Sequence, residues 1–173
     1  MKQPFRLFQQ QIDFEFAARG WLYWSPLSIG GRLIEEKGEL AREVNHCYGD
    51  KKKRTDEAVG SIELEIGDVA YTLFCLANSM NYVICASGVR TSGYGNDRND
   101  PMSLLNRLDG HAGKLNHSLD EEHTRATICS RISITMKVLR ELAESMGVNF
   151  EDAISKSITK SFSRDKERFP AGV

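Results

Sequence analysis

The chain has 173 residues, with 23 Lys and Arg against 24 Asp and Glu, and 40% of its residues are hydrophobic. This composition is typical of a soluble globular domain and excludes collagen-like, disulfide-scaffold and fully disordered chains. The formal net charge of −1 gives no general argument for binding a nucleic acid polymer or a membrane surface. A chain of this length buries roughly 70% of its unfolded surface, so any metal is expected to be functional rather than structural.

The apolar run 69–77 is the longest in the sequence, and it is about half as long as the ~20 residues that cross a bilayer. The start of the chain, Met1 to Pro4, carries no hydrophobic signal region. No Cys-x-x-Cys pair is present, and Cys75 and Cys129 lie in apolar helical patterns, as reduced core thiols do. We therefore expect a cytoplasmic protein.

Helical periodicity dominates the sequence, and no segment alternates as a strand does. Ser25 and Pro26 are typical of a helix cap and first turn, and Gly49 of a helix end. In chain order, we expect a helix over 8–21 that ends at Gly20, a helix from Pro26 to about Tyr48, a polar loop over 50–60, a helix over about 61–80, a glycine-rich loop over 87–101, helices over about 101–119 and 123–146, and a shorter helix capped by Asn149. The predicted fold class is all-α, packed as a helical bundle.

The domain organisation is expected to be one all-α domain over 1–173, with an acidic catalytic unit at 1–86, a linker at 87–101 and a second unit with a basic tail at 102–173. The second unit reads as a diverged copy, because Arg32-Leu33 returns as Arg107-Leu108 and segment 76–80 returns as 142–146. Where the first copy has Glu35, Glu36 and Glu39, the second has Gly110, His111 and Lys114. The second copy is therefore unsuited to the same acidic chemistry.

Carboxylates concentrate on two neighbouring predicted helices. Glu36 and Glu39 are three residues apart on one helix, and Glu65 and Asp68 are three apart on the next, so each pair shares a helix face. Because like charges at this spacing repel, a cation between the helices is expected. Oxygen donors without a nearby His or Cys suit Mg²⁺ or Mn²⁺, and Mg²⁺ is usually bound together with substrate phosphates. Glycines beside the pairs, Gly38 and Gly67, are expected to let helices approach.

Basic residues fit the same interpretation, because cations can neutralise a polyphosphate. The expected phosphate-binding residues are Lys52, Lys53 and Arg54 after the first acidic helix, and Lys156, Lys160 and Arg164 near the C-terminus.

The segment Glu35-Glu36-Lys37-Gly38-Glu39-Leu40, followed by Glu65-Ile66-Gly67-Asp68-Val69, resembles the signature of MazG-like nucleotide pyrophosphohydrolases. The resemblance to bacterial or phage members of this family extends from Trp24 to Asn81 and includes the ending 153–169, about half of the chain. It implies hydrolysis of a nucleoside triphosphate between the α and β phosphates. It also implies that Glu36, Glu39, Glu65 and Asp68 hold two or three Mg²⁺ or Mn²⁺ ions, and that Glu35 orients or deprotonates the attacking water.

The chain departs from the family in its middle, because short members go directly from the second acidic helix to the C-terminal helix. We interpret the inserted second unit as a packing surface that another subunit would otherwise supply. A homodimer or higher homo-oligomer of this chain is therefore expected.

The base-binding residues are less clear from the sequence. Trp24, Asn78 and Asn81 are candidates, and Asp13 can accept two hydrogen bonds from guanine. This favours GTP or dGTP slightly over dUTP and dCTP. The alternatives are an enzyme like phosphoribosyl-ATP pyrophosphohydrolase and a non-catalytic helical module that binds metal or a basic partner.

Overall fold

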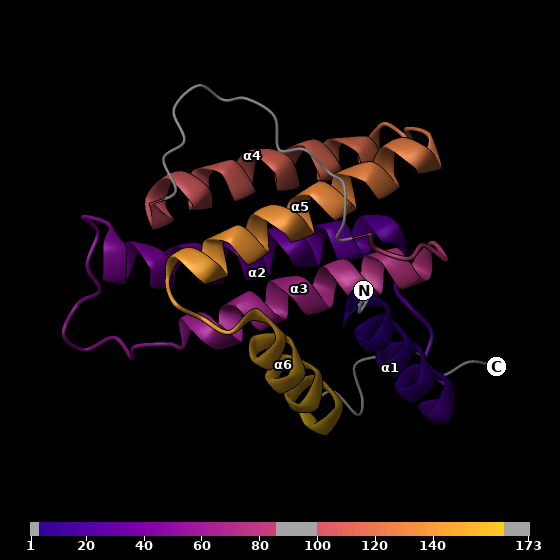
Figure 1. Ribbon diagram of the computed structural model, residues 1–173, viewed down its shortest axis with the longest axis horizontal. Coiled ribbons are helices and arrows are strands. Elements are labelled where there is room, and N and C mark those ends of the chain that lie inside the picture. Colours follow the sequence, from indigo (N-terminus) through magenta and orange to yellow (C-terminus); the bar gives the residue numbers. More distant parts are fainter. Residues whose placement is uncertain (1–3, 86–99, 165–173) are drawn as a thin grey trace.

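Six helices make up the described part of the chain in the computed structural model, which describes residues 4–85 and 100–164 (Figure 1). The helices are α1 (Pro4–Arg19), α2 (Pro26–Tyr48), α3 (Ile62–Ser79), α4 (Pro101–Asp120), α5 (Arg125–Ser145) and α6 (Phe150–Arg164). The predicted all-α fold is therefore confirmed. None of these helices is long and apolar enough to cross a membrane.

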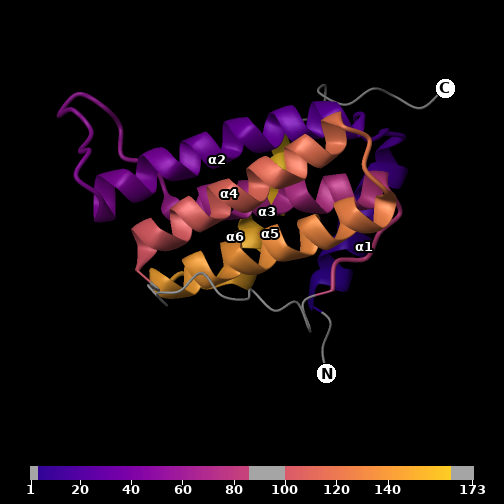
Figure 2. The same cartoon turned by 90° about the horizontal axis from the view of Figure 1, so that it is seen from above.

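Helices α2 and α3 form one antiparallel hairpin, and α4 and α5 form a second that lies along it (Figures 1 and 2). Helix α3 lies at the centre, in contact with α2, α5, α6 and α1. Every residue from Ile66 to Asn78 is accordingly buried, as expected of a helix surrounded by protein. Helix α6 crosses the N-terminal half of α3, and this places α6 beside the acidic residues of α3 (Figure 1).

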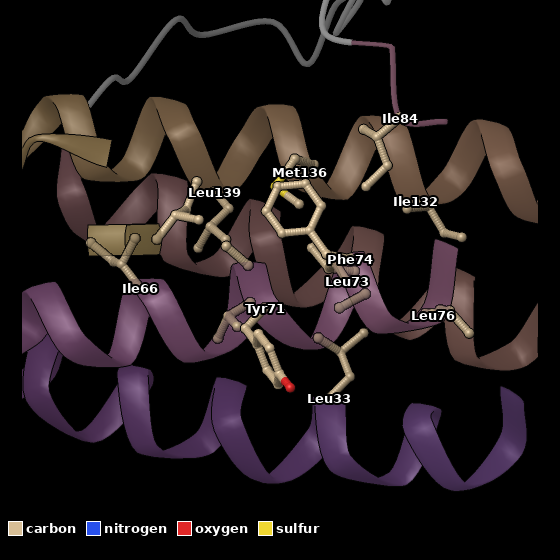
Figure 3. Close-up of a cluster of buried hydrophobic side chains, with 14 of the residues drawn as sticks. Leu33, Ile66, Tyr71, Leu73, Phe74, Leu76, Ile84, Ile132, Met136 and Leu139 are labelled. Atoms are coloured by element: carbon tan, nitrogen blue, oxygen red, sulfur yellow. The ribbon is translucent and has the colours of Figure 1, made fainter. Parts of the chain in front are cut away.

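The hydrophobic core joins the two hairpins through α3 and α5. Figure 3 shows Phe74 of α3 among Met136 and Ile132 of α5, with Leu33 reaching in from α2. All four side chains are at most 1% exposed. Cys75 and Cys129 are buried free thiols, as the sequence predicts.

The helix boundaries agree with the local sequence signals. Ser25 caps α2 by accepting a hydrogen bond from the Ser28 amide, and α2 ends at Tyr48 as predicted. Helix α1 begins four residues before the predicted Phe8 because Phe5 is buried against Phe74 and Phe150. Of the predicted loop over 87–101, residues 87–99 lie outside the described residues.

The two hairpins end alike. Helix α3 has Met80 as its C-cap and α5 has Met146, with φ near −102° at both, and a residue of positive φ follows each cap. The Ser79 and Ser145 hydroxyls each donate to a carbonyl three residues back, at 2.8 and 2.7 Å. This supports the internal repeat, which stays a prediction, as does the division into units.

Candidate metal centre

Three carboxylates meet between α2 and α3. Glu36 comes from α2, and Glu65 and Asp68 come from adjacent turns of α3. One oxygen of each lies within 4.8 Å of the others, and Glu36 and Asp68 are buried while Glu65 is half-buried. The i, i+3 spacing on α3 and the packing of α2 on α3 thus produce the cluster that the sequence predicts for these three residues.

Two oxygens of this cluster are buried without a hydrogen-bond partner among the described residues, namely Glu36 Oε2 and Glu65 Oε2. Leaving a buried acceptor unpaired costs about 1–3 kcal/mol, and more when it is charged. Unpaired carboxylate oxygens converging from two helices fit a hard divalent cation, which binds oxygen ligands. The donor set contains no His or Cys, which favours Mg²⁺ or Mn²⁺ over zinc.

Burial and mutual repulsion make ionisation of the clustered carboxyl groups unfavourable. Burial raises the pKa of Glu36 to about 7; the neighbouring Arg32 opposes this, and the charges of Asp68 and Glu39 add to it. Burial and then the charges of Glu39 and Asp68 also raise the pKa of Glu65. The metal-free site therefore holds more protons than isolated carboxyl groups would.

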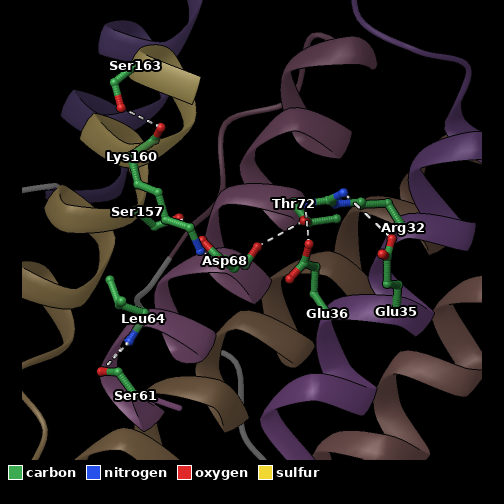
Figure 4. A network of polar contacts seen from close by, with 10 residues as sticks. All are labelled: Arg32, Glu35, Glu36, Ser61, Leu64, Asp68, Thr72, Ser157, Lys160 and Ser163. Atoms are coloured by element: carbon green, nitrogen blue, oxygen red, sulfur yellow. Dashed lines mark hydrogen bonds and ion pairs between the residues drawn. The ribbon is translucent and has the colours of Figure 1, made fainter. Parts of the chain in front are cut away.

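Two cationic side chains partly neutralise the negative charge of the cluster. Arg32 forms an ion pair with Glu36 from one turn earlier on α2. Lys160 reaches Asp68 from α6 (Figure 4). Its Nζ lies 2.6 Å from Asp68 Oδ2. The Ser157 hydroxyl donates to the other Asp68 oxygen. Ser157 lies one turn before Lys160 on the same face of α6, and no local sequence pattern singles it out.

Gly67 makes the contact between α3 and α6 possible. A Cβ built on Gly67 would lie 2.3 Å from the Ala153 carbonyl oxygen, so only glycine fits there. The predicted role of Gly67 in helix approach is therefore confirmed. The same prediction is wrong for Gly38, because a Cβ there would meet nothing within 4 Å.

Glu35 and Glu39 lie beside the cluster rather than within the group of three. Both are exposed, and Glu35 lies 3.6 Å from Arg32. Glu39 acts on the cluster through its charge, which raises the pKa of both Glu36 and Glu65. The assignments of Glu35 to the water and of Glu39 to the metal stay proposals.

The structure does not place the basic loop after α2 at the cluster. Lys53 is buried in an ion pair with Glu43, Lys52 donates to the His46 carbonyl at 2.8 Å, and Arg54 lies 3.4 Å from Glu57. These contacts do not favour a role of the three residues in binding phosphate at the carboxylate cluster. The sequence pattern did not reveal that Glu43, on the same face of α2 as Glu36, holds the loop.

The three predicted phosphate-binding residues near the C-terminus differ in their contacts and exposure. Lys160 contacts the cluster directly, whereas Lys156 forms a 2.6 Å ion pair with Glu63. Arg164 is exposed at the end of α6.

The predicted base-binding residues fall into an ordered polar network. The buried Asn78 amide exchanges hydrogen bonds with Gln9 and donates to the Tyr23 hydroxyl at 3.0 Å. Tyr23 in turn donates to Asp13 Oδ1 at 2.6 Å, and burial raises the pKa of Tyr23. Asn78 is thus engaged by α1, whereas Asp13 is exposed.

Trp24 and Asn81 lie at the edges of the core. Trp24 is half-buried and packs against the core. Asn81 is exposed with a φ of 52°, and its carbonyl accepts a 2.7 Å hydrogen bond from Arg125. The structure does not bring these two residues to the acidic cluster through any described contact.

Comparison with known proteins places the acidic helices in a known domain. Residues 24–87 match the family described as MazG nucleotide pyrophosphohydrolase domain. The uncharacterized protein YpjD of Bacillus subtilis (strain 168) is 59% identical over 59 residues, which are 34% of this chain and 53% of that protein. The chain thus spans about half the length of this relative, and no solved structure matches the chain significantly. The segment that matches this family, residues 24–87, carries all three clustered carboxylates, Glu36, Glu65 and Asp68.

Proposed function

We propose that this protein hydrolyses nucleoside triphosphates between the α and β phosphates, giving a monophosphate and pyrophosphate. The observation that carries the proposal is the pair of buried, unpartnered oxygens of Glu36 and Glu65 beside Asp68. They need a cation, and the MazG nucleotide pyrophosphohydrolase domain that contains them links that cation to phosphate anhydride chemistry.

In this proposal Glu36, Glu65 and Asp68 hold the ions, with Glu39 completing the set on the exposed side. A bound divalent ion would lower the pKa of a water molecule, clamp phosphate oxygens and offset charge that develops in the transition state. Glu35, exposed next to Glu36, would orient the water and take its proton on a carboxylate oxygen. Lys160, held at Asp68 by α6, supplies positive charge beside the phosphates.

The proposed base site lies farther along α3, toward α1. Burial raises the pKa of the Cys75 thiol, and the nearby charge of Asp13 of α1 adds to this, whereas that of Arg32, the partner of Glu36, opposes it. Cys75 is seven residues beyond Asp68, or roughly 10 Å along the helix, a distance that a nucleoside triphosphate can span. The Asp13 carboxylate offers acceptors for guanine, which supports GTP or dGTP as the preferred substrate.

Hydrolysis of all eight common NTPs and dNTPs tests the proposal. The assay contains Mg²⁺ or Mn²⁺, with EDTA as control, and chromatography separates monophosphate, diphosphate, phosphate and pyrophosphate. Metal-dependent release of monophosphate and pyrophosphate is expected, with guanine nucleotides fastest. Turnover of none of the eight would contradict the proposal and favour a non-catalytic metal-binding module or a substrate such as phosphoribosyl-ATP.

We further propose that the active form is a homodimer. The support is that α4 and α5 already cover the α2–α3 hairpin within one chain, so fewer subunits are needed than for short chains of this family. Light scattering measures the mass, and a clean monomer with full activity would contradict this assembly.

A further inference from the structure

A hollow with a basic lining lies on the outer face of α2, where the loop 50–60 folds back against the helix. The hollow has a volume of about 580 Å³, and we call it the basic hollow. Its lining comprises Gly38, Ala41, Arg42 and Asn45 of α2 with Lys51, Lys52, Lys53, Arg54 and Glu57 of the loop. Figure 2 shows α2 at the edge of the molecule, with the loop extending beyond one end.

The basic hollow is separate from the metal centre. Successive residues of a helix are turned by roughly 100°, so Gly38, Ala41 and Asn45 share one face of α2. Glu36 and Glu43 point to the opposite face, toward α3 and the carboxylate cluster. None of the proposed metal ligands, Glu39 included, lines the hollow.

The lining carries an excess of positive charge. Of its five cationic side chains, Lys53 is neutralised by Glu43, and Arg54 lies near Glu57, the single carboxylate of the lining. Arg42 approaches a carboxylate only at 3.8 Å and its side chain is 64% exposed. Lys51 has no ion-pair partner among the described residues. Concentrating such charges around a concave surface attracts anions.

Fixed contacts hold the loop that shapes the hollow. Glu43 accepts from Lys53 and, at 3.0 Å, from the Gly60 amide, so one buried side chain ties both ends of the loop. The Lys53 ammonium also donates to the Ala58 carbonyl at 2.8 Å. The Lys52 ammonium donates to the carbonyl of His46 in the last turn of α2. Its positive charge there is favourable, because the C-terminal end of a helix carries partial negative charge. The hollow therefore exists before any ligand arrives, and this lowers the entropic cost of binding.

Gly38 opens the wall of the hollow. Apart from its chain neighbours and the backbone of its own helix, no described atom lies within 4 Å of a Cβ built there, so a ligand can approach α2 closely. Exposed Arg42 and Lys51 can then close on the ligand from the helix and from the loop. Arginine and lysine in this arrangement suit phosphoryl oxygens, which accept several charge-assisted hydrogen bonds.

We propose that the basic hollow binds a small polyphosphate anion, either inorganic or carried by a nucleotide, at a site distinct from the metal centre. Because no carboxylate of the metal centre lines the hollow, this binding requires no divalent ion. The proposal therefore stands or falls independently of the hydrolysis proposed above.

Isothermal titration calorimetry of the full chain with sodium tripolyphosphate in EDTA tests the site. The variant Arg42→Gln/Lys51→Gln removes two cations that hold no part of the loop, and it should weaken binding about tenfold. The matched control Arg6→Gln/Lys137→Gln removes the same charges from α1 and α5 and should bind within about twofold of the wild type. Thermal unfolding checks that both variants remain folded.

Parallel titrations identify the source of the anion. A nucleoside triphosphate that binds more tightly than tripolyphosphate indicates a nucleotide ligand, and equal or weaker binding indicates free polyphosphate. Absence of binding in EDTA would overturn the proposal, as would equal weakening in both double variants. A short DNA duplex that binds more tightly than tripolyphosphate through Arg42 and Lys51 would also overturn it, in favour of a nucleic acid backbone.

Discussion

The α-carbon of Gly67 faces the carbonyl oxygen of Ala153 so closely that a Cβ would lie 2.3 Å from it. This contact brings α6 against α3 and sets Ser157 and Lys160 on Asp68. We expect Gly67→Ala to destabilise the protein by at least about 2 kcal/mol, because the added methyl group overlaps backbone that has no free space. Urea unfolding measures the change.

Gly38→Ala is the matched control on α2. Alanine at this position meets nothing, and it lowers the conformational entropy of the unfolded chain. We expect a gain of about 0.5–1 kcal/mol in the free energy of unfolding. Equal effects of the two substitutions would contradict the close approach at Gly67.

The carboxylate cluster predicts a steep loss of turnover in conservative variants. Glu36→Gln, Glu39→Gln and Asp68→Asn each remove a proposed metal ligand while preserving shape, and we expect at least a roughly hundredfold fall in kcat. Glu63→Gln is the control, because Glu63 lies on α3 with Asp68 but is paired with Lys156 outside the cluster. Near-normal turnover in two of the three ligand variants would refute the assignment.

Metal binding should release a proton near neutral pH. The pKa of Glu36 is raised by burial to about 7, above its ordinary value of 4.5. Folding of the metal-free protein is therefore favoured by this group below pH 4.5, and the contribution is lost as the pH rises toward 7. Because a divalent ion must displace the proton, binding of Mg²⁺ at pH 6 should release roughly one proton, and much less at pH 8.

Calorimetry in buffers of different ionisation enthalpy measures this release. Glu36→Gln should abolish it, whereas Glu63→Gln should leave it unchanged. Mg²⁺ binding to the wild type at pH 6 without proton release would show that Glu36 is already ionised.

The buried ion pair between Glu43 and Lys53 should govern the stability of the loop after α2. Their side chains are 2% and 4% exposed, so Glu43→Gln leaves a buried ammonium without its carboxylate. We expect a loss of about 3–5 kcal/mol. In Glu43→Leu/Lys53→Met both charges are absent, and much of the stability should return. If thermal unfolding instead gave additive losses for the two positions, the pair would not be coupled.

Local signals in the sequence predict all six described helices, but not every boundary. The Ser25-Pro26 start and the Gly49 end bound α2 correctly, because capping depends on residues within one turn. The start of α1 was missed, since Phe5 becomes helical by packing against Phe74 and Phe150, which lie far away in the sequence. Tertiary contacts of this kind cannot be predicted from the local periodicity of the sequence.

The acidic part of the site was also predictable, because i, i+3 spacing fixes a shared helix face before the helices pack. The partners of the basic residues were not. Lys53, which follows the first acidic helix, is bound to Glu43, whereas Lys160, near the C-terminus, is bound to Asp68. Whether a basic residue is free to bind substrate or is paired with an internal carboxylate depends on the path of the loop after α2 and on where α6 crosses α3. Neither can be read from local sequence.

The ion pair between Lys160 and Asp68 has a consequence for the order of assembly. Arg32 on Glu36 and Lys160 on Asp68 act as built-in counterions, so the chain can complete its fold before it meets a divalent ion. The carboxylates that would hold a divalent ion are therefore already in place, and the ion would not have to organise unfolded polypeptide. The Lys160 ammonium, at the end of a flexible side chain beside Asp68, can also meet an anion that enters with the metal.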